Sequence, residues 1–258
     1  MILPYLKHQL RAGNAHSIHS PFIYDLYTQA ICPSAEDKSD FEAIASLRRQ
    51  LLKNTDEIEI LDLGAGSRRN RSNRRKISDI ARNAEKPARF GELFYRLTRH
   101  FNPQTVLELG TSLGLTTAYF ARAATDAHVT TMEGCPETAR LASENFEKLG
   151  VGTIELVVGN IDHTLPAWLN AQQKTIDLVF FDANHRLEPT LRYFEDVLPY
   201  TDDASVLIFD DIYWSKEMTM AWEKIKAHPQ VQVAVDLFWV GLIFFRKEQA
   251  KEQFRLRF

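Results

Sequence analysis

Runs of apolar residues alternate with helical patterns through the second half of the chain. Continuous apolar runs, such as those at 179–181 and 206–209, are typical of strands buried on both faces of a sheet. Five strands of this kind are predicted, at 106–109, 128–133, 154–158, 176–182 and 205–210. Helices are predicted between them, at about 115–124, 136–149, 163–172 and 188–198. Because crossovers join strands that alternate with helices, the pattern predicts an α/β protein with a largely parallel sheet.

The end of the chain breaks this alternation. After a predicted helix at 216–228, two apolar strands at 231–236 and 238–246 follow with only Leu237 between them. No crossover helix fits there, so the two strands must form an antiparallel hairpin. We therefore predict a Rossmann-like, seven-stranded mixed sheet with an antiparallel last strand. The alternation at 254–258 leaves open whether that segment pairs with the N-terminal part of the chain or with another subunit.

The first part of the chain has a different pattern. Ser20 followed by Pro21 is typical of a helix start, and apolar residues recur at helical spacing over 41–52. These features predict a mostly helical N-terminal cap over residues 1–86, followed by the α/β domain over residues 87–258. Within the cap lies the basic run 68–76, which is either a solvated loop or a clamp for an acidic substrate or RNA.

Composition narrows the classes of function. The formal net charge is -3, which argues against general nucleic-acid binding. Cys32 and Cys135 lie far apart and match no metal-ligand spacing, which favours a reducing compartment. The start lacks the apolar run of a signal peptide, and no segment has the roughly 20 apolar residues of a membrane helix. We therefore expect a cytoplasmic protein without a membrane partner.

Two segments combine an apolar strand, an acid and a glycine turn, at 58–67 and at 105–117. Such a turn holds a charged cofactor at the carboxyl end of a parallel strand. A cofactor with a ribose also needs an acid about 20 residues further on, at the end of the next strand. Only the second segment is followed by one, Glu133. We therefore predict that 105–117 is the cofactor loop, and that Asp62 to Gly66 form a structural turn or a substrate-side loop.

The chemistry of the second turn favours a particular cofactor. Its sequence, from Gly110 to Gly114, is not the G-x-G-x-x-G of dinucleotide domains, and Glu108 places a negative charge just before it. A carboxylate there suits an ammonium group better than a phosphate. S-adenosylmethionine carries an ammonium, a carboxylate, a sulfonium and a ribose. We expect Glu108 to hold the ammonium, the hydroxyls of Ser112 and Thr116 to hold the carboxylate, and Glu133 to bind the ribose diol.

Three acids follow the next two strands. Asp182 ends one strand, and Asp210 and Asp211 end the other, so their carboxylates should crowd one edge of the sheet. A divalent cation such as Mg²⁺ would relieve this repulsion, whereas the alternative is that these acids cap helices or that Asp182 only binds the cofactor. His185 is placed to take a proton from an acceptor hydroxyl, with a surface or core histidine as the alternative.

At these residues the chain resembles class I S-adenosylmethionine-dependent methyltransferases, most closely the catechol and caffeoyl-CoA O-methyltransferase group. The resemblance covers roughly residues 88–246. Residues 91–92 resemble a Gly-Gln segment of that group, 108–116 its glycine motif, and 158–162 its adenine-contacting loop. The resemblance implies cofactor contacts at Glu108, Gly110, Thr111, Ser112, Gly114, Thr116, Glu133, Gly134, Gly159, Asn160, Ile161 and Asp182. It also implies metal ligands at Asp182, Asp210 and Asp211.

Two positions depart from the group. It usually has lysine where this chain has His185, and Asp-Asn where this chain has Asp210 and Asp211. We expect an enzyme that methylates an oxygen of a small molecule, with S-adenosylmethionine as the donor, Mg²⁺ or another divalent cation as an aid, and Asp182 and His185 as catalytic groups. The identity of the acceptor and the oligomeric state, including a homo-oligomer, stay open.

Other functions remain as alternatives. One is an RNA or protein methyltransferase that docks through residues 68–76, although nucleic acid is the less favoured partner. Another is a non-catalytic module that only binds S-adenosylmethionine. A nicotinamide-dependent oxidoreductase is the weakest alternative, because the G-x-G-x-x-G motif is missing and the sheet ends in an antiparallel hairpin.

Overall fold

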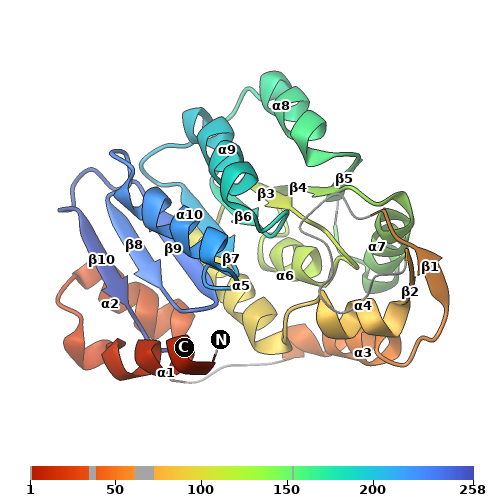
Figure 1. Ribbon diagram of the computed structural model, residues 1–258, viewed down its shortest axis with the longest axis horizontal. Coiled ribbons are helices and arrows are strands. Elements are labelled where there is room, and N and C mark those ends of the chain that lie inside the picture. Colours follow the sequence, from red (N-terminus) through yellow and green to blue (C-terminus); the bar gives the residue numbers. More distant parts are fainter. Residues whose placement is uncertain (1, 35–38, 62–72, 153) are drawn as a thin grey trace.

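An eight-stranded mixed sheet forms the centre of the protein (Figure 1). The computed structural model describes residues 2–34, 39–61, 73–152 and 154–258. The strand order is β10-β8-β9-β7-β6-β3-β4-β5. The strands are β3 (Thr105–Leu109), β4 (His128–Glu133), β5 (Ile154–Val158), β6 (Leu178–Phe181), β7 (Val206–Asp210), β8 (Val233–Asp236), β9 (Val240–Phe244) and β10 (Glu252–Arg255). Only β9 runs antiparallel to its neighbours, β7 and β8. The predicted α/β fold with a terminal antiparallel hairpin is confirmed.

The predicted number of seven strands is wrong, because β10 is an eighth. It pairs in parallel with β8, with Gln253 opposite Ala234, and Leu256 then forms a bridge with Gly13. The C-terminal alternation therefore pairs with the chain's own sheet and with its N-terminal segment. The strand was not predicted because it lies at an edge of the sheet, where its side chains are exposed or half-buried and no continuous apolar run is required.

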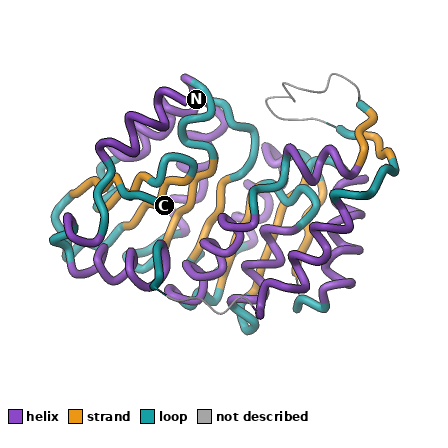
Figure 2. Tube along the Cα trace, turned by 90° about the horizontal axis from the view of Figure 1, so that it is seen from below, coloured by secondary structure: helices purple, strands orange, loops and turns teal. Residues whose placement is uncertain are grey.

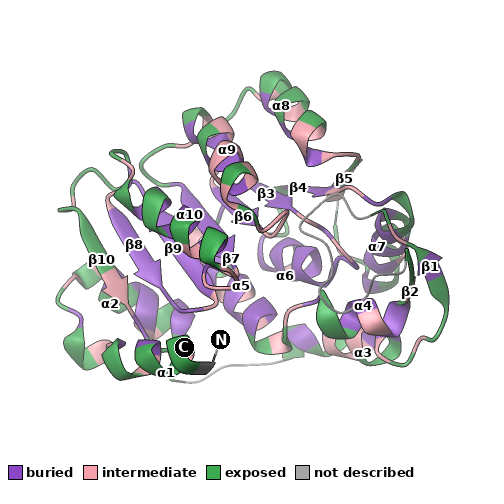
Figure 3. Ribbon diagram, viewed as in Figure 1, coloured by how far each residue is buried: buried purple, intermediate pink, exposed green. Residues whose placement is uncertain are grey.

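Helices cover both faces of this sheet (Figure 2). One face carries α2 (Pro21–Leu26), α5 (Ala88–Phe101) and α6 (Leu115–Ala123), with α7 (Pro136–Leu149) beside α6. The other face carries α8 (Ile161–Ala171), α9 (Leu187–Val197) and α10 (Lys216–Ala227). Successive side chains of a strand point to opposite faces of the sheet, so Val106 packs with the first set of helices and Leu107 with the second. The central strands are buried accordingly (Figure 3).

The N-terminal segment packs against this fold in two places. Near its start are α1 (Ile2–Arg11) and a π-helical turn (Tyr27–Ile31), and Ile23 and Leu26 of α2 belong to the same apolar core as the sheet. In the later part, α3 (Glu42–Leu51), β1 (Glu57–Glu59) and α4 (Ile77–Asn83) share an apolar cluster with α6 and α7, and β2 (Arg74–Lys76) pairs with β1. Short 3-10 turns lie at Ala15–Ser17, Ser39–Phe41 and Leu198–Tyr200.

Several details of the N-terminal segment bear on the predictions. The hydroxyl of Ser20 accepts a hydrogen bond from the amide of Ile23, as the predicted helix cap requires. Only the end of the basic run 68–76 is described, and its residues 74–76 form β2, which pairs with β1. Segment 62–66, in the first glycine motif, lies outside the described residues. Of the helices in the described ranges, none combines the length and apolar character that crossing a membrane requires.

Candidate active site

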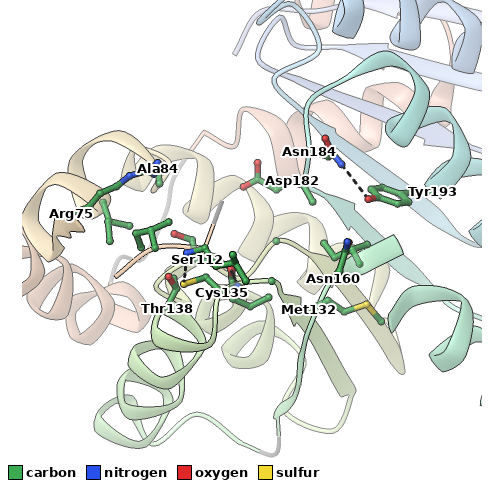
Figure 4. A pocket seen from close by; sticks show the side chains of 18 residues that line it. Arg75, Ala84, Ser112, Met132, Cys135, Thr138, Asn160, Asp182, Asn184 and Tyr193 are labelled. Carbon is green, nitrogen blue, oxygen red and sulfur yellow. Dashed lines mark hydrogen bonds between the residues drawn. The ribbon is translucent and has the colours of Figure 1, made fainter. Parts of the chain in front are cut away.

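A cavity of about 270 Å³ lies at the carboxyl ends of the central strands (Figure 4). The residues that line it include seven predicted to contact the cofactor: Gly110, Ser112, Glu133, Gly134, Asn160, Ile161 and Asp182. They follow four parallel strands, β3, β4, β5 and β6, whose ends meet at one edge of the sheet. The other predicted contacts, Glu108, Thr111, Gly114, Thr116 and Gly159, are not among the described lining residues.

The sequence did not predict the rest of the cavity wall. It consists of Ile60, Leu61, Arg75, Ile80, Ala84, Met132, Cys135, Thr138, Ala183, Asn184 and Tyr193. Five of these come from the N-terminal segment, and two of the five, Ile60 and Leu61, belong to the first glycine motif at 58–67. A signal for this wall was present in that motif, which suggested a substrate-side loop but not which residues would reach the cavity.

The turn after β3 leaves no room for a side chain at Gly110. This residue has a φ of +104°, and a Cβ added there would lie 2.4 Å from the carbonyl oxygen of Asp182. That oxygen belongs to backbone, so it cannot move aside as the end of a flexible side chain would. The close approach of these two backbones brings the glycine loop and the acid of β6 to the same cavity.

Replacing Gly110 with alanine should weaken binding of S-adenosylhomocysteine by about 10- to 100-fold and lower the free energy of unfolding by roughly 2–4 kcal/mol. Calorimetric titration and urea unfolding would measure the two effects. Gly150→Ala is the matched control for backbone strain, because Gly150 has a φ of +57° with no atom within 4 Å of an added Cβ. Gly152→Ala has neither problem. Equal effects of all three substitutions would contradict a specific role of the close approach.

Glu133 is held rigidly at the wall of the cavity. One carboxylate oxygen accepts the amide of Ser112 at 2.9 Å, and the other accepts the amide of Cys135 at 2.9 Å. Burial raises the pKa of Glu133 above its usual range, and these amides together with that of Gly134 oppose the shift. A carboxylate has about four lone-pair sites, so Glu133 can still accept a hydroxyl hydrogen from a ligand.

Glu108 lies behind the cavity, inside β3. It is fully buried, and one of its oxygens accepts the hydroxyls of Thr117 and Thr131, the latter at 2.6 Å. Thr131 also shares a 2.6 Å hydrogen bond with Thr111, so these polar groups form one buried network. Burial raises the pKa of Glu108 to about 8, against the effect of the two hydroxyls. Direct contact between Glu108 and an ammonium group therefore stays a prediction.

Backbone strain gathers around the site. Ser112, Asn184, His185 and Asp211 have positive φ angles of 50°, 67°, 43° and 51°. Residues other than glycine adopt this conformation at a cost of order 1–3 kcal/mol, and such residues cluster at functional sites. All four belong to loops that follow the strands β3, β6 and β7. These four conformations therefore lower the stability of the fold at this edge of the sheet.

The acids after β6 and β7 do converge with His185. The Nε2 atom of His185 lies 3.3 Å from Oδ1 of Asp182, and one donor atom from each of Asp182, His185 and Asp210 falls within a group 4.8 Å across. Burial, followed by the charge of Asp182, raises the pKa of Asp210 to about 7. Burial opposes protonation of His185, but the carboxylates of Asp182, Asp210 and Asp211 outweigh it and raise the pKa of the imidazole.

Lys86 also belongs to this cluster, although no pattern in the sequence predicted its position there. Its Nζ atom lies 2.6 Å from Oδ2 of Asp210 and 2.7 Å from Oδ1 of Asp211. Burial disfavours the ammonium, but the charges of Asp210, Asp211 and Asp182 outweigh that effect and raise the pKa of Lys86. Lys86 lies in the link between α4 and α5, and no local spacing relates it to acids more than 120 residues away in the sequence.

The link between α4 and α5 is fixed on both sides. The carboxylate of Glu85 accepts the amide of Leu113, in the glycine loop, at 2.7 Å. The guanidinium of Arg48, from α3, donates to the carbonyl oxygen of Lys86 at 2.6 Å. Glu85 therefore contacts the glycine loop, while the next residue, Lys86, contacts Asp210 and Asp211.

Lys86 lies among the acids that the sequence assigned to a divalent cation. Asp211 is directed at Lys86, and the same ammonium lies within 2.6 Å of Asp210. The donor atoms that do lie within 4.8 Å of one another come from Asp182, His185 and Asp210, a set that is poorer in oxygen than Mg²⁺ prefers. Metal binding by Asp182, Asp210 and Asp211 thus stays a prediction of the sequence.

Residues 107–212 match the family described as "Methyltransferase domain". This part of the chain is therefore similar to methyltransferase domains. The match runs from β3 to just beyond the end of β7, so it includes the glycine loop, Glu133 and the acids after β6 and β7. The recognition of this class from sequence is therefore confirmed.

Curated relatives resemble the methyltransferase domain over about half of the chain. A catechol O-methyltransferase from Mycobacterium tuberculosis is 31% identical over 127 residues, which are 48% of this chain and 56% of the relative. A catechol O-methyltransferase from Niastella koreensis is 25% identical over 124 residues, covering 47% of this chain and 55% of the relative. The chain thus spans little more than half the length of the curated relatives that it matches.

Solved structures share the fold over more of the chain. An O-methyltransferase from Bacillus cereus, crystallised with S-adenosylhomocysteine, superimposes with a TM-score of 0.56 at 19% identity and covers 86% of this chain and 97% of its own. An O-methyltransferase-like structure from Klebsiella pneumoniae gives a TM-score of 0.59 at 17% identity, with 87% and 96% covered. At these identities the comparison shows the fold of the methyltransferase domain.

Proposed function

We propose that this chain is an S-adenosylmethionine-dependent methyltransferase that methylates a hydroxyl oxygen of a small molecule. The observation that carries the proposal is the position of Asp182, which belongs to two sites at once. It lines the cavity together with Glu133 and the glycine loop, and it lies 3.3 Å from His185 in the acid cluster. A cofactor in that cavity therefore borders groups suited to proton transfer.

The residues around the cavity fit the parts of S-adenosylmethionine. Glu133 offers fixed carboxylate oxygens to a ribose diol, while Met132 and Ile161 provide apolar wall for a base. Asp182 places a negative charge beside the cationic end of the molecule. When bound, S-adenosylmethionine would supply a methyl group on a sulfonium sulfur, which leaves as a neutral thioether when an oxygen nucleophile attacks the methyl carbon in line.

In the proposed reaction, His185 takes the proton of the acceptor. The hydroxyl oxygen bonds to the methyl carbon as the sulfur–carbon bond breaks and its electron pair stays on sulfur. The hydroxyl proton passes to the imidazole, which must be neutral to accept it. A phenol resembles tyrosine, whose pKa is about 10, so a base beside it is needed at neutral pH. The names of the curated relatives support a catechol-like acceptor.

Binding of the product nucleoside tests the cofactor assignment. We expect calorimetry to detect S-adenosylhomocysteine but not NAD, and Glu133→Ala to weaken that binding by about 10- to 100-fold, because two charge-assisted hydrogen bonds of the loop and any bond to the ribose are lost. Glu155→Ala is the matched control, since Glu155 lies on the adjacent strand β5 and its carboxylate bonds to Thr130, His128 and Trp168. Binding of NAD alone would overturn the assignment.

Methyl transfer itself is tested with S-adenosylmethionine and a panel of catechols and other phenols. Release of S-adenosylhomocysteine that depends on one of these acceptors would support the proposal. Intact nucleoside binding without transfer to any hydroxyl would instead favour the non-catalytic module.

A further inference from the structure

The acid cluster at the ends of β6 and β7 contains a cation that belongs to the chain. The ammonium of Lys86 lies between Asp210 and Asp211, at 2.6 and 2.7 Å, and only 14% of the lysine side chain is exposed. We infer that Lys86 takes the place of a divalent cation at this cluster, so that methyl transfer here proceeds without a metal. The inference deepens the proposed function and rests on it.

Lys86 is placed by the fold and is not a surface lysine that happens to reach an acid. The guanidinium of Arg48 donates to the carbonyl oxygen of Lys86, and the preceding residue, Glu85, accepts the amide of Leu113. The next residue, Pro87, is the N-cap of α5. These contacts fix the backbone on both sides of the lysine. The ammonium therefore reaches the acids with little conformational freedom to lose.

A lysine in this position and a divalent cation exclude each other. Oδ2 of Asp210 and Oδ1 of Asp211 both face the ammonium, so a cation that took these oxygens would meet it at close range. Two positive charges that close repel strongly in a buried site. The same carboxylates can therefore balance either the lysine or a metal ion, and here the lysine is part of the covalent chain.

The charge of Lys86 also bears on the acceptor. The positive charges of Lys86 and of protonated His185 both favour the ionised form of Asp210. A fixed positive charge near the acceptor favours the ionised form of its hydroxyl, which is the help that a metal ion gives in other sites. Lys86 is thus a positioning residue that sets the electrostatics of the cluster, while His185 receives the proton.

Binding of Mn²⁺ alone, followed by electron paramagnetic resonance, tests the inference without any acceptor. We expect no binding to the wild-type chain below about millimolar Mn²⁺. Lys86→Ala should leave Asp182, His185 and Asp210 free to bind one Mn²⁺ at least about tenfold more tightly, and a further Asp210→Asn substitution should abolish the gain. Lys86→Arg should bind no Mn²⁺, because it keeps the charge.

Controls separate this result from damage to the fold. Lys226→Ala removes another nearly buried lysine, paired with Glu223 at 2.8 Å in α10, and should not create a Mn²⁺ site. Cooperative urea unfolding of each variant would show that it is folded, and Lys86→Gln replaces Lys86→Ala if that variant is not. A wild-type site that holds one Mn²⁺ and loses it on Asp210→Asn would overturn the inference. So would a failure of both neutral variants to gain binding, since the acids would then form no cation site.

The result does not depend on the proposed activity. If Lys86→Ala gains Mn²⁺ but no acceptor is methylated, the lysine still replaces a cation and the proposed reaction has failed. If the wild type transfers methyl groups only when a divalent cation is added, the reaction stands and the inference about Lys86 is wrong.

Discussion

Replacing His185 with asparagine should lower the rate of methyl transfer by about 10²- to 10⁴-fold, the usual contribution of a general base. Affinity for S-adenosylhomocysteine should change little, because His185 is not among the described residues that line the cavity. Single-turnover rates and calorimetry on the same preparation would measure the two quantities. His163→Asn, on the exposed side of α8, is the matched control.

The pH profile gives the same prediction a second readout. The neighbouring carboxylates raise the pKa of His185 above its ordinary 6.5, so the neutral, proton-accepting form becomes dominant only above that value. The rate measured in EDTA should therefore rise with pH and level off above the raised pKa. Asp211→Asn removes one of the charges that raise it, so the rising limb should move to lower pH. A limb that stays in place in Asp211→Asn, or a rate that survives in His185→Asn, would exclude this imidazole as the base.

The parts of the fold that the sequence predicted are those with a local signal. Strands such as β6 and β7 are buried on both faces, so they appear as unbroken apolar runs, and their predicted positions agree with the structure within a few residues. The hairpin β8–β9 followed from the lack of space for a crossover. Edge strand β10 had neither signal, because half of its residues face solvent.

The candidate site divides in the same way. Glycines and acids at strand ends could be predicted, since parallel strands bring their carboxyl ends to one edge, and Gly110, Glu133 and Asp182 do meet at one cavity. Lys86 and the wall residues Ile60, Leu61, Arg75, Ile80 and Ala84 could not be predicted, because the N-terminal segment reaches the site through the packing of α3 and α4 on α6. Contacts between segments so far apart in sequence leave no periodic pattern.

The charge of Lys86 should also control how stability depends on pH. Replacing Lys86 with methionine, which keeps an unbranched side chain but lacks the terminal ammonium, should lower the free energy of unfolding by roughly 3–5 kcal/mol at pH 8, because carboxylates are left buried without their partner. At pH 5 the loss should be much smaller. Urea unfolding in EDTA at pH 5, 6, 7 and 8 would measure it.

The sign follows from the acids. The pKa of Asp210 is about 7 in the folded protein because the group is buried beside Asp182, and it is near 4 in the unfolded chain. The folded state thus binds more protons between these values, and stability falls as pH rises through them. Without Lys86 the pKa of Asp210 rises further, so the fall continues to higher pH. Lys86 itself stays charged throughout, since its pKa is raised above an already high value.

A second lysine shows what would contradict this account. Lys226→Met removes an ammonium whose side chain is 7% exposed, but its partner Glu223 is 59% exposed and is left facing water. The free energy of unfolding should therefore fall only slightly in Lys226→Met, and by the same amount at every pH between 5 and 8. If Lys86→Met and Lys226→Met lost equal stability at every pH, Lys86 would contribute through packing alone. The acids after β6 and β7 would then need another source of positive charge.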